Sequence, residues 1–346
     1  RVLSKARHAS APRAGGGLRA EIWRRRASPE ALLALVDPLP LELAPRHASA
    51  LLVHLRRAAP AALDSDPRYK ALLAAVRAAP LAAWPPKDIA LVAHALQEMG
   101  ALTRIFVQAA ALSLETRVAA CTLQDLDMLL RAMVRARVRD LRLLRRVGER
   151  FGADAGRGAA SLTPRAISSF AHAFASLDFE HAPLLHALGH AAPPRLRDFG
   201  GQDLSLLLLA FARFEVRPED TLAAAGRLVA SLPVPSLSAY NPQVVSSVLY
   251  AFGKLRFRHE EAVRALSRRA SDSMPAFKPQ DVSLTLFGLS LLGLRRASFP
   301  ALRASARHLA AGGLAFFAPQ ALGNALHALL CLGFAHPRAL RALAGE

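Results

Sequence analysis

The sequence predicts an all-α protein: an α-solenoid of about seven to eight helix-pair repeats. Three observations predict it: a pattern that recurs, a helix-start signal in each copy, and apolar residues at helical spacing. Clear copies begin at Asn241, Lys278 and Ala318, looser ones at Pro85, Thr122, Thr163 and Gly200, and a degraded one near Ala44. With the first apolar residue of each copy as position 0, the series is Ala48, Ile89, Leu126, Ile167, Leu204, Val245, Val282 and Leu322, spaced 41, 37, 41, 37, 41, 37 and 40 residues apart. Units of this length stack, because one unit cannot bury its own apolar face.

Each copy begins with the residues that favour a helix N-terminus. Proline follows a capping position at Thr163, Asn241, Lys278 and Ala318, and proline is well suited to the first helical position. An aspartate stands in the first turn of four copies, at Asp88, Asp125, Asp203 and Asp281. These four could be collected as a catalytic carboxylate cluster, but one acid at each helix start is what the helix dipole and capping favour.

Helical spacing separates two faces of each first helix. Positions 0, +3, +4, +7 and +10 are apolar and predict the core, as in Val245, Val248, Leu249, Phe252 and Leu255. Position +6 is Ala or Gly in the seven copies from Ile89 onward, which lets a neighbouring helix approach closely.

The opposite face holds positions −2, +1, +5 and +9, which are rich in Gln, Ser, His, aromatic and basic residues. Gln243, Tyr250 and Lys254 show the pattern in one copy. Amides, rings and cations of this kind can read, stack on and neutralise RNA. The same residues can instead satisfy one another between adjacent repeats, and the sequence leaves both interpretations open.

A second, more basic helix is expected after each first one, for example at residues 140–151, 218–232, 259–274 and 299–309, with an exposed loop at 151–161. Basic residues of both helices and of the N-terminal segment, together with Gln243 and Tyr250, form the predicted RNA-binding set. Its members are Arg24, Arg25, Arg26, Arg131, Arg135, Arg142, Arg145, Arg146, Arg213, Gln243, Tyr250, Lys254, Arg256, Arg268 and Arg269.

Composition points to a polyanionic partner. The 346 residues carry a formal net charge of +19, and 53% are hydrophobic, enough for a core. The two cysteines, Cys121 and Cys331, are far apart and are expected to be reduced core thiols. His186 and His190 are four residues apart, but no carboxylate or thiol completes a metal site. No metal, other cofactor or small-molecule substrate is therefore expected.

Two segments need separate interpretation. Residues 1–29 contain eight Lys or Arg and one acid, Glu21, and predict a basic arm that precedes a repeat domain at 30–346. Their composition is that of an organellar transit sequence, or of a mature arm lying on RNA. Residues 309–337 lack Asp, Glu, Lys and Arg, yet proline and glycine interrupt them and their second half matches a repeat, so no membrane span is expected.

Enzyme motifs are not found in the sequence. Gly15-Gly16-Gly17 lacks the Lys-Ser/Thr of a phosphate-binding loop, and neither GxSxG nor HExxH occurs. The expected protein is not an enzyme.

The Pro-Gln-x-Val/Leu-Ser-x-x-Leu-x-Ala-Phe-x-Lys/Arg-Leu pattern resembles the helical repeats of octotricopeptide and heptatricopeptide proteins, which are related to the helical region of FAST-kinase-like and RAP-domain proteins. The resemblance covers residues 85–343 and is clearest in the copies from Gly200 onward. Position +5, often Trp in the family, is here His, Arg, Leu, Tyr or Phe. The sequence ends at Glu346 after the last repeat, so the RAP domain and any nuclease-like activity are not carried over.

The resemblance implies RNA binding in a mitochondrion or plastid. The expected function is a non-enzymatic structural component that contacts rRNA in a mitochondrial ribosome, in the matrix, beside ribosomal or other ribonucleoprotein proteins. An organellar factor for mRNA or rRNA stability or processing is the alternative within the same class. A protein-docking scaffold is the alternative of a different class.

Overall fold

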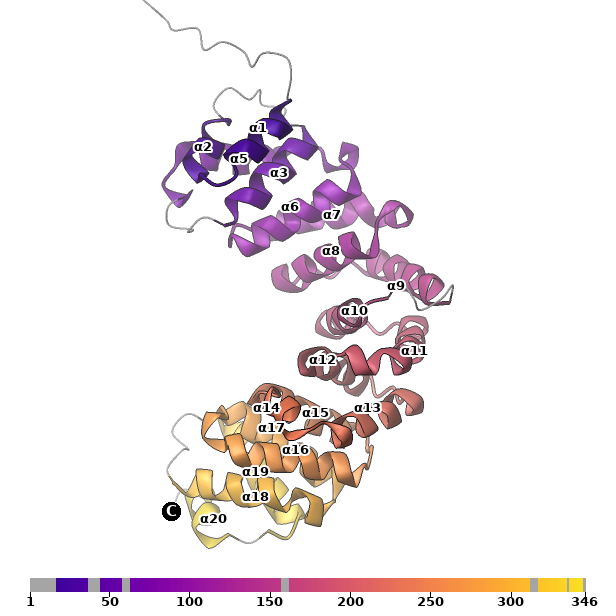
Figure 1. The fold of residues 1–346 in the computed structure, drawn as a ribbon, viewed down its shortest axis with the longest axis vertical. Helices are drawn as coiled ribbons and strands as arrows, with labels where there is room; N and C mark the ends of the chain where they lie inside the picture. The colour runs from indigo at the N-terminus through magenta and orange to yellow at the C-terminus, as the bar shows by residue number, and fades with distance from the viewer. Residues whose placement is uncertain are drawn as a thin grey trace, which may run out of the picture. The chain divides into compact units, whose positions relative to one another are not determined.

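The computed structural model describes residues 17–36, 44–57, 63–156, 162–311, 317–334 and 336–344. Throughout these ranges the regular structure is helical and no strand occurs (Figure 1). The chain forms two compact units, residues 1–140 and 141–346, and each is described by itself. The all-α helical-repeat fold that the sequence predicts is confirmed.

The first unit is built on three successive first helices. Its helices are α1 (Leu18–Arg25), α2 (Pro29–Leu33), α3 (Pro45–Leu55), α5 (Pro67–Ala78), α6 (Pro86–Glu98), α7 (Arg104–Glu115) and α8 (Leu123–Ala136). Helix α3 packs on α6 and α6 on α8, while α1 packs on the other side of α3. Residues 17–29 of the predicted arm thus include a helix that contacts the repeats, and residues 1–16 lie outside the described part.

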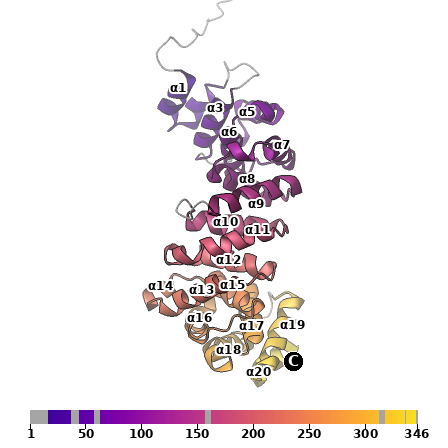
Figure 2. The ribbon, with the colours of Figure 1, turned by 90° about the vertical axis from the view of Figure 1, so that its right-hand side faces the viewer.

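The second unit consists of two layers of helices. Its helices are α9 (Leu141–Gly156), α10 (Pro164–Ser176), α11 (Ala182–Ala191), α12 (Gly201–Arg213), α13 (Glu219–Ser231), α14 (Val234–Ser238), α15 (Pro242–Lys254), α16 (Glu260–Ser273), α17 (Pro279–Leu292), α18 (Arg295–Ala310), α19 (Pro319–Cys331) and α20 (Pro337–Ala344). The first helices α10, α12, α15, α17 and α19 stack in one layer, and the second helices α9, α11, α13, α16, α18 and α20 stack in the other (Figures 1 and 2).

The repeat register is marked by the backbone at position +11. Every positive-φ residue in the described ranges occupies this position: Gly100, Arg137, Asp178, Glu215, Arg256, Gly293 and Gly333. The following N–H turns back to the carbonyl of position +7, as from Phe257 to Phe252 at 2.9 Å. This geometry is a helix C-cap that satisfies otherwise unpaired carbonyls. Four of the seven residues are not glycine, so the sequence alone did not reveal the cap.

The predicted helix starts and core are confirmed. First helices begin at Pro86, Leu123, Pro164, Gly201, Pro242, Pro279 and Pro319, each within one residue of the expected start. In α15 the core stripe is fully buried, with Val245, Val248, Leu249 and Phe252 at 0% exposure.

A hydrogen bond between Ser and Asp links successive first helices. The serine at position +1 donates to the aspartate at position −1 of the next repeat: Ser49 to Asp88 at 2.6 Å, Ser168 to Asp203 at 2.7 Å and Ser246 to Asp281 at 3.3 Å. Asp125 and Asp281 also accept the backbone N–H at the N-cap, from Thr122 and Lys278. Asp88 and Asp203 thus link repeats, Asp125 caps its own helix and Asp281 does both, and the four lie at four different helix starts.

We expect Asp281→Ala to lower the free energy of unfolding by about 1–3 kcal/mol, because the buried carboxylate satisfies both the Lys278 N–H and the Ser246 hydroxyl. Asp272→Ala is the matched control, since Asp272 is exposed on the neighbouring helix α16 and should change stability by less than about 0.5 kcal/mol. Urea unfolding followed by circular dichroism measures both. Equal effects of the two variants would contradict the linking role of Asp281.

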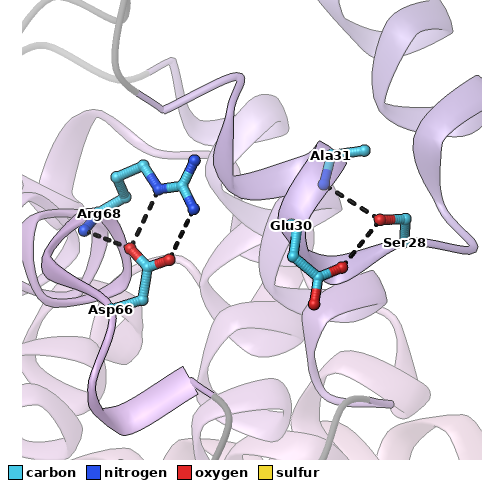
Figure 3. A network of polar contacts seen from close by, with 5 residues as sticks. All are labelled: Ser28, Glu30, Ala31, Asp66 and Arg68. Carbon is cyan, nitrogen blue, oxygen red and sulfur yellow. Dashed lines mark hydrogen bonds and ion pairs between the residues drawn. The ribbon is translucent and has the colours of Figure 1, made fainter.

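Local caps also hold the small helices of the first unit. Figure 3 shows Ser28 accepting the Ala31 N–H at 3.2 Å at the start of α2. At the start of α5, Asp66 accepts the Arg68 N–H at 2.8 Å and two guanidinium hydrogen bonds at 3.1 and 2.7 Å. These bonds, led by those from the Arg68 side chain, lower the pKa of Asp66 to about 2.

Three local expectations were wrong. The loop expected at 151–161 is helical as far as Gly156, where α9 ends, and residues 157–161 lie outside the described part. Helix α18 begins at Arg295 and not at residue 299, and Pro300 lies inside it. Cys121 is a buried thiol as expected, but Cys331 is exposed, with Sγ 3.4 Å from Nε2 of His327.

Candidate nucleic-acid interface

The basic residues of the first-helix face are largely paired with acids. In the second unit, Arg213 contacts Asp178 at 2.7 Å and Lys254 contacts Glu215 at 3.4 Å. Each pair joins position +9 of one repeat to the left-handed position +11 of the repeat before it. In the first unit, Arg131 pairs with Asp127 at 2.9 Å along α8, and Arg135 is exposed. Three of the predicted cations are thus partly neutralised by neighbouring carboxylates.

Tyr250 packs between repeats. Its ring stacks on that of Phe287 at a centroid distance of 6.2 Å and an interplanar angle of 29°. Both rings remain half-buried, and with Gln243, Lys278 and Gln280 the tyrosine lines a cavity of about 580 Å³ between α12, α15 and α17. The first-helix face therefore combines inter-repeat packing with one polar hollow.

The second helices of the second unit carry exposed cations. On α9, Arg142, Arg145 and Arg146 are exposed. On α16, Arg268 is exposed, but Arg269 donates to Tyr240 O at 3.0 Å and Ser238 O at 2.8 Å and so holds the preceding connection. Arg256, at the left-handed end of α15, is exposed.

Helix α18 carries basic residues that the predicted set did not include. Arg296, Arg303 and Arg307 are exposed, and among the described residues none of the three forms an ion pair. Phe299 is 49% exposed on the same helix. A cavity of about 530 Å³ between the end of α16 and α18 is lined by Phe299, Arg303, Arg307, His308 and Met274. Exposed arginines beside an exposed ring are the side chains that bind a phosphate backbone and stack on a base.

A sequence signal for this surface existed. Residues 282–345 contain six arginines and neither Asp nor Glu, so α18 carries no acid of its own to pair with its arginines. Positions within the repeat do not show this imbalance, because charge sums over a surface and does not follow the repeat period.

The predicted arginines of the N-terminal segment lie at the end of α1 and just after it. Arg24 and Arg25 both pair with Glu21 at 2.7 Å. Arg26 donates to Trp23 O at 2.7 Å, and its guanidinium carbon lies 4.0 Å from the centroid of the Trp23 ring. The three side chains are therefore held on α1, with Arg24 and Arg26 exposed.

Histidine caps second helices and makes stability depend on pH. Nδ1 of His181 accepts the Leu184 N–H at 3.1 Å at the start of α11, a bond that requires the unprotonated nitrogen. Burial lowers the pKa of His181, as it does those of His47, His54, His94 and His172. These histidines bind protons more readily in the unfolded chain than in the folded one. Their contribution to the free energy of unfolding is therefore fully present above the pKa of the unfolded state and is lost as pH falls through the lower pKa of the folded state.

We therefore expect the urea midpoint to fall as pH is lowered through about 6.5, the ordinary histidine pKa. His181→Asn keeps a side-chain acceptor for the helix cap but cannot titrate. The urea midpoint of this variant should therefore fall less steeply with decreasing pH than that of the wild-type protein. Urea titrations between about pH 5 and pH 8 compare the two proteins. A wild-type midpoint that rises toward acid pH would contradict the linkage.

The remaining observations concern other kinds of site and known proteins. In the described ranges no three His, Cys, Asp or Glu side chains come together as metal ligands. None of the described helices is long and apolar enough to cross a bilayer. No protein-family model matches the sequence, and no curated protein matches it.

Proposed function

We propose that the protein binds single-stranded RNA through the exposed surface of α16 and α18, which we call the basic second-helix surface. It comprises Arg268, Arg296, Phe299, Arg303 and Arg307. The observation that carries the proposal is the set of exposed arginines on α18, a helix without acids, that form no ion pair among the described residues. By contrast, the first-helix cations Arg213 and Lys254 already have carboxylate partners.

RNA fits this surface for physical reasons. Arginine neutralises phosphate and stacks on bases through its planar guanidinium, and an exposed ring such as Phe299 offers a platform that any base can use. Binding of this type is governed by the backbone and is weakly sequence-selective. The polar hollow beside Tyr250 is the place where a single base could add selectivity to it.

The cellular setting is proposed from the resemblance of the repeats to organellar RNA-binding families. We propose a structural, non-enzymatic role on rRNA in a mitochondrial ribosome, with a maturation factor for organellar transcripts as the alternative and a plastid as the alternative compartment. Sedimentation with ribosomal subunits that persists after a high-salt wash supports the structural role. Release from subunits together with recovery on free transcripts supports the maturation factor.

A protein-docking scaffold is favoured by one observation. Ile105 and Leu112 lie two turns apart on α7 of the first unit and are 78% and 68% exposed, which is typical of a surface that meets another protein. This surface lies in the first unit, outside the basic second-helix surface, so RNA binding does not require it.

The direct test is binding of a labelled single-stranded RNA of about 12 nucleotides, within the site size of single-strand binders. We expect fluorescence anisotropy to show binding at low salt that weakens steeply as salt rises from about 50 to about 200 mM, because bound phosphates release counterions. Replacing Arg24, Arg25 and Arg26 together by Ala should weaken the binding of RNAs of different sequence to a similar extent. Absence of binding at low salt, or binding that does not weaken as salt rises, would contradict RNA binding and would favour the protein-docking scaffold.

A further inference from the structure

A tryptophan on the first unit is left largely in water. Trp23, on α1, is 59% exposed, whereas the chain's other tryptophan, Trp84, is 3% exposed. Burial of so large a ring would stabilise the fold by more than most side chains. An exposed tryptophan with a fixed orientation is therefore a feature that packing does not explain.

The Trp23 ring is held in place by two neighbours. The Arg26 guanidinium lies over the ring at 4.0 Å from its centroid and also donates to the Trp23 carbonyl at 2.7 Å. The His54 ring, on α3, meets the indole edge-on, with centroids 6.0 Å apart and planes at 69°. A cation over one face of an indole and a second ring at its edge restrict its rotation, so little further ordering is needed when a ligand stacks on it.

The space beside the ring is concave and basic. A cavity of about 740 Å³ between α1 and α3 is lined by Trp23, Arg19, Arg24, Ala20, Ala50 and His54. Among the described residues that line it, two are arginines and none is an acid. The nearby carboxylate of Glu21 is engaged by Arg24 and Arg25, each at 2.7 Å. The surroundings of the ring are thus suited to an anionic ligand that has a flat apolar part.

We propose that Trp23 is a stacking platform for one base of single-stranded RNA, with Arg19, which is exposed and forms no ion pair among the described residues, contacting an adjoining phosphate. This inference rests on the proposed function and adds a second contact site, in the first unit. The cavity volume is in the range of small-ligand pockets, and base–aromatic stacking tolerates any sequence because every base has a π-face. A base-bearing phosphate chain supplies both a flat ring for Trp23 and negative charge for the arginines that line the cavity, which favours RNA as the ligand.

Tryptophan fluorescence provides a readout specific to this site, since only one of the two indoles is exposed. The full-length protein is titrated with oligouridylate of about 12 nucleotides, and tryptophan emission is recorded alongside anisotropy of a labelled copy. We expect the long-wavelength emission of Trp23 to be quenched with the same midpoint as the anisotropy change. Trp23→Leu should remove this quenching and weaken binding about 5- to 100-fold, and Trp23→Phe should weaken it less.

Three controls make the result decisive. Trp84→Phe should leave the quenching in place, and circular dichroism confirms that each variant is folded. Heparin, a polyanion without bases, should bind without quenching Trp23; equal quenching by heparin would overturn base stacking. If oligouridylate binds but Trp23 emission and the affinity of Trp23→Leu are unchanged, the platform is refuted while the proposed function stands. If the wild-type protein shows no anisotropy change at low salt, both fail together.

Discussion

Gly288→Ala is expected to destabilise the second unit by about 2–3 kcal/mol, the upper part of the range for overpacked cores. Gly288 occupies position +6 of its repeat, on α17. A Cβ there would lie 2.5 Å from the carbonyl oxygen of Leu249 and 2.7 Å from the Cα of Tyr250, both backbone atoms of α15. Because backbone cannot rotate away as a side chain can, α15 and α17 would have to separate, and they share one of the most extensive helix contacts in the unit.

Gly323→Ala is the matched control on the next first helix, α19. A Cβ at Gly323 would meet nothing within 4 Å, so the substitution should stabilise the helix by up to about 1 kcal/mol through propensity alone. Urea unfolding followed at the helical circular-dichroism band measures both variants. Opposite signs are expected, and destabilisation of equal size in the two variants would contradict the close approach of α15 and α17.

The largest functional effect is expected from a charge-matched pair of double variants. Arg303→Ala with Arg307→Ala removes two exposed, unpaired cations of the basic second-helix surface. Arg213→Ala with Lys254→Ala removes the same charge from the first-helix face, where both cations are paired. We expect the first double variant to lower the slope of log affinity against log salt by about 1.4, since each single-strand phosphate contact contributes about 0.7. The second should change the slope little.

The comparison separates a local contact from the overall charge of the protein. Both double variants have the same net charge, so a purely long-range field would reduce affinity equally. Equal losses of affinity and slope would contradict a dedicated basic second-helix surface. A larger loss of affinity in the Arg213 and Lys254 variant would indicate that RNA binds at the first-helix face instead.

Much of the fold could be predicted from the sequence because the signals are local and repeated. Proline and capping residues set the helix starts, and the 3.6-residue spacing of apolar residues set the buried stripe of α15. The left-handed caps were missed at Arg137, Asp178, Glu215 and Arg256. None of these four positions holds the glycine that usually marks this turn.

The candidate site was predicted less well, because it depends on which partner each side chain finds. Lys254 and Arg213 looked like phosphate ligands, but residues 39 and 35 positions earlier neutralise them. For Tyr250 the sequence left open both stacking on RNA and packing between repeats, and in the structure a ring in the next repeat shares its face. Arg303 and Arg307 fell outside the repeat pattern altogether. The spacing of residues along one helix shows which face they share. It does not show which residues of the next repeat they contact, because that depends on how closely the helices stack.

Crosslinking of bound RNA, followed by identification of the modified peptides, tests the central claim most directly. We expect adducts on α16 and α18, above all at or beside Phe299, with a second cluster on α1 around Trp23. Adducts confined to the first-helix face, at Gln243, Tyr250 and Lys254, would contradict it.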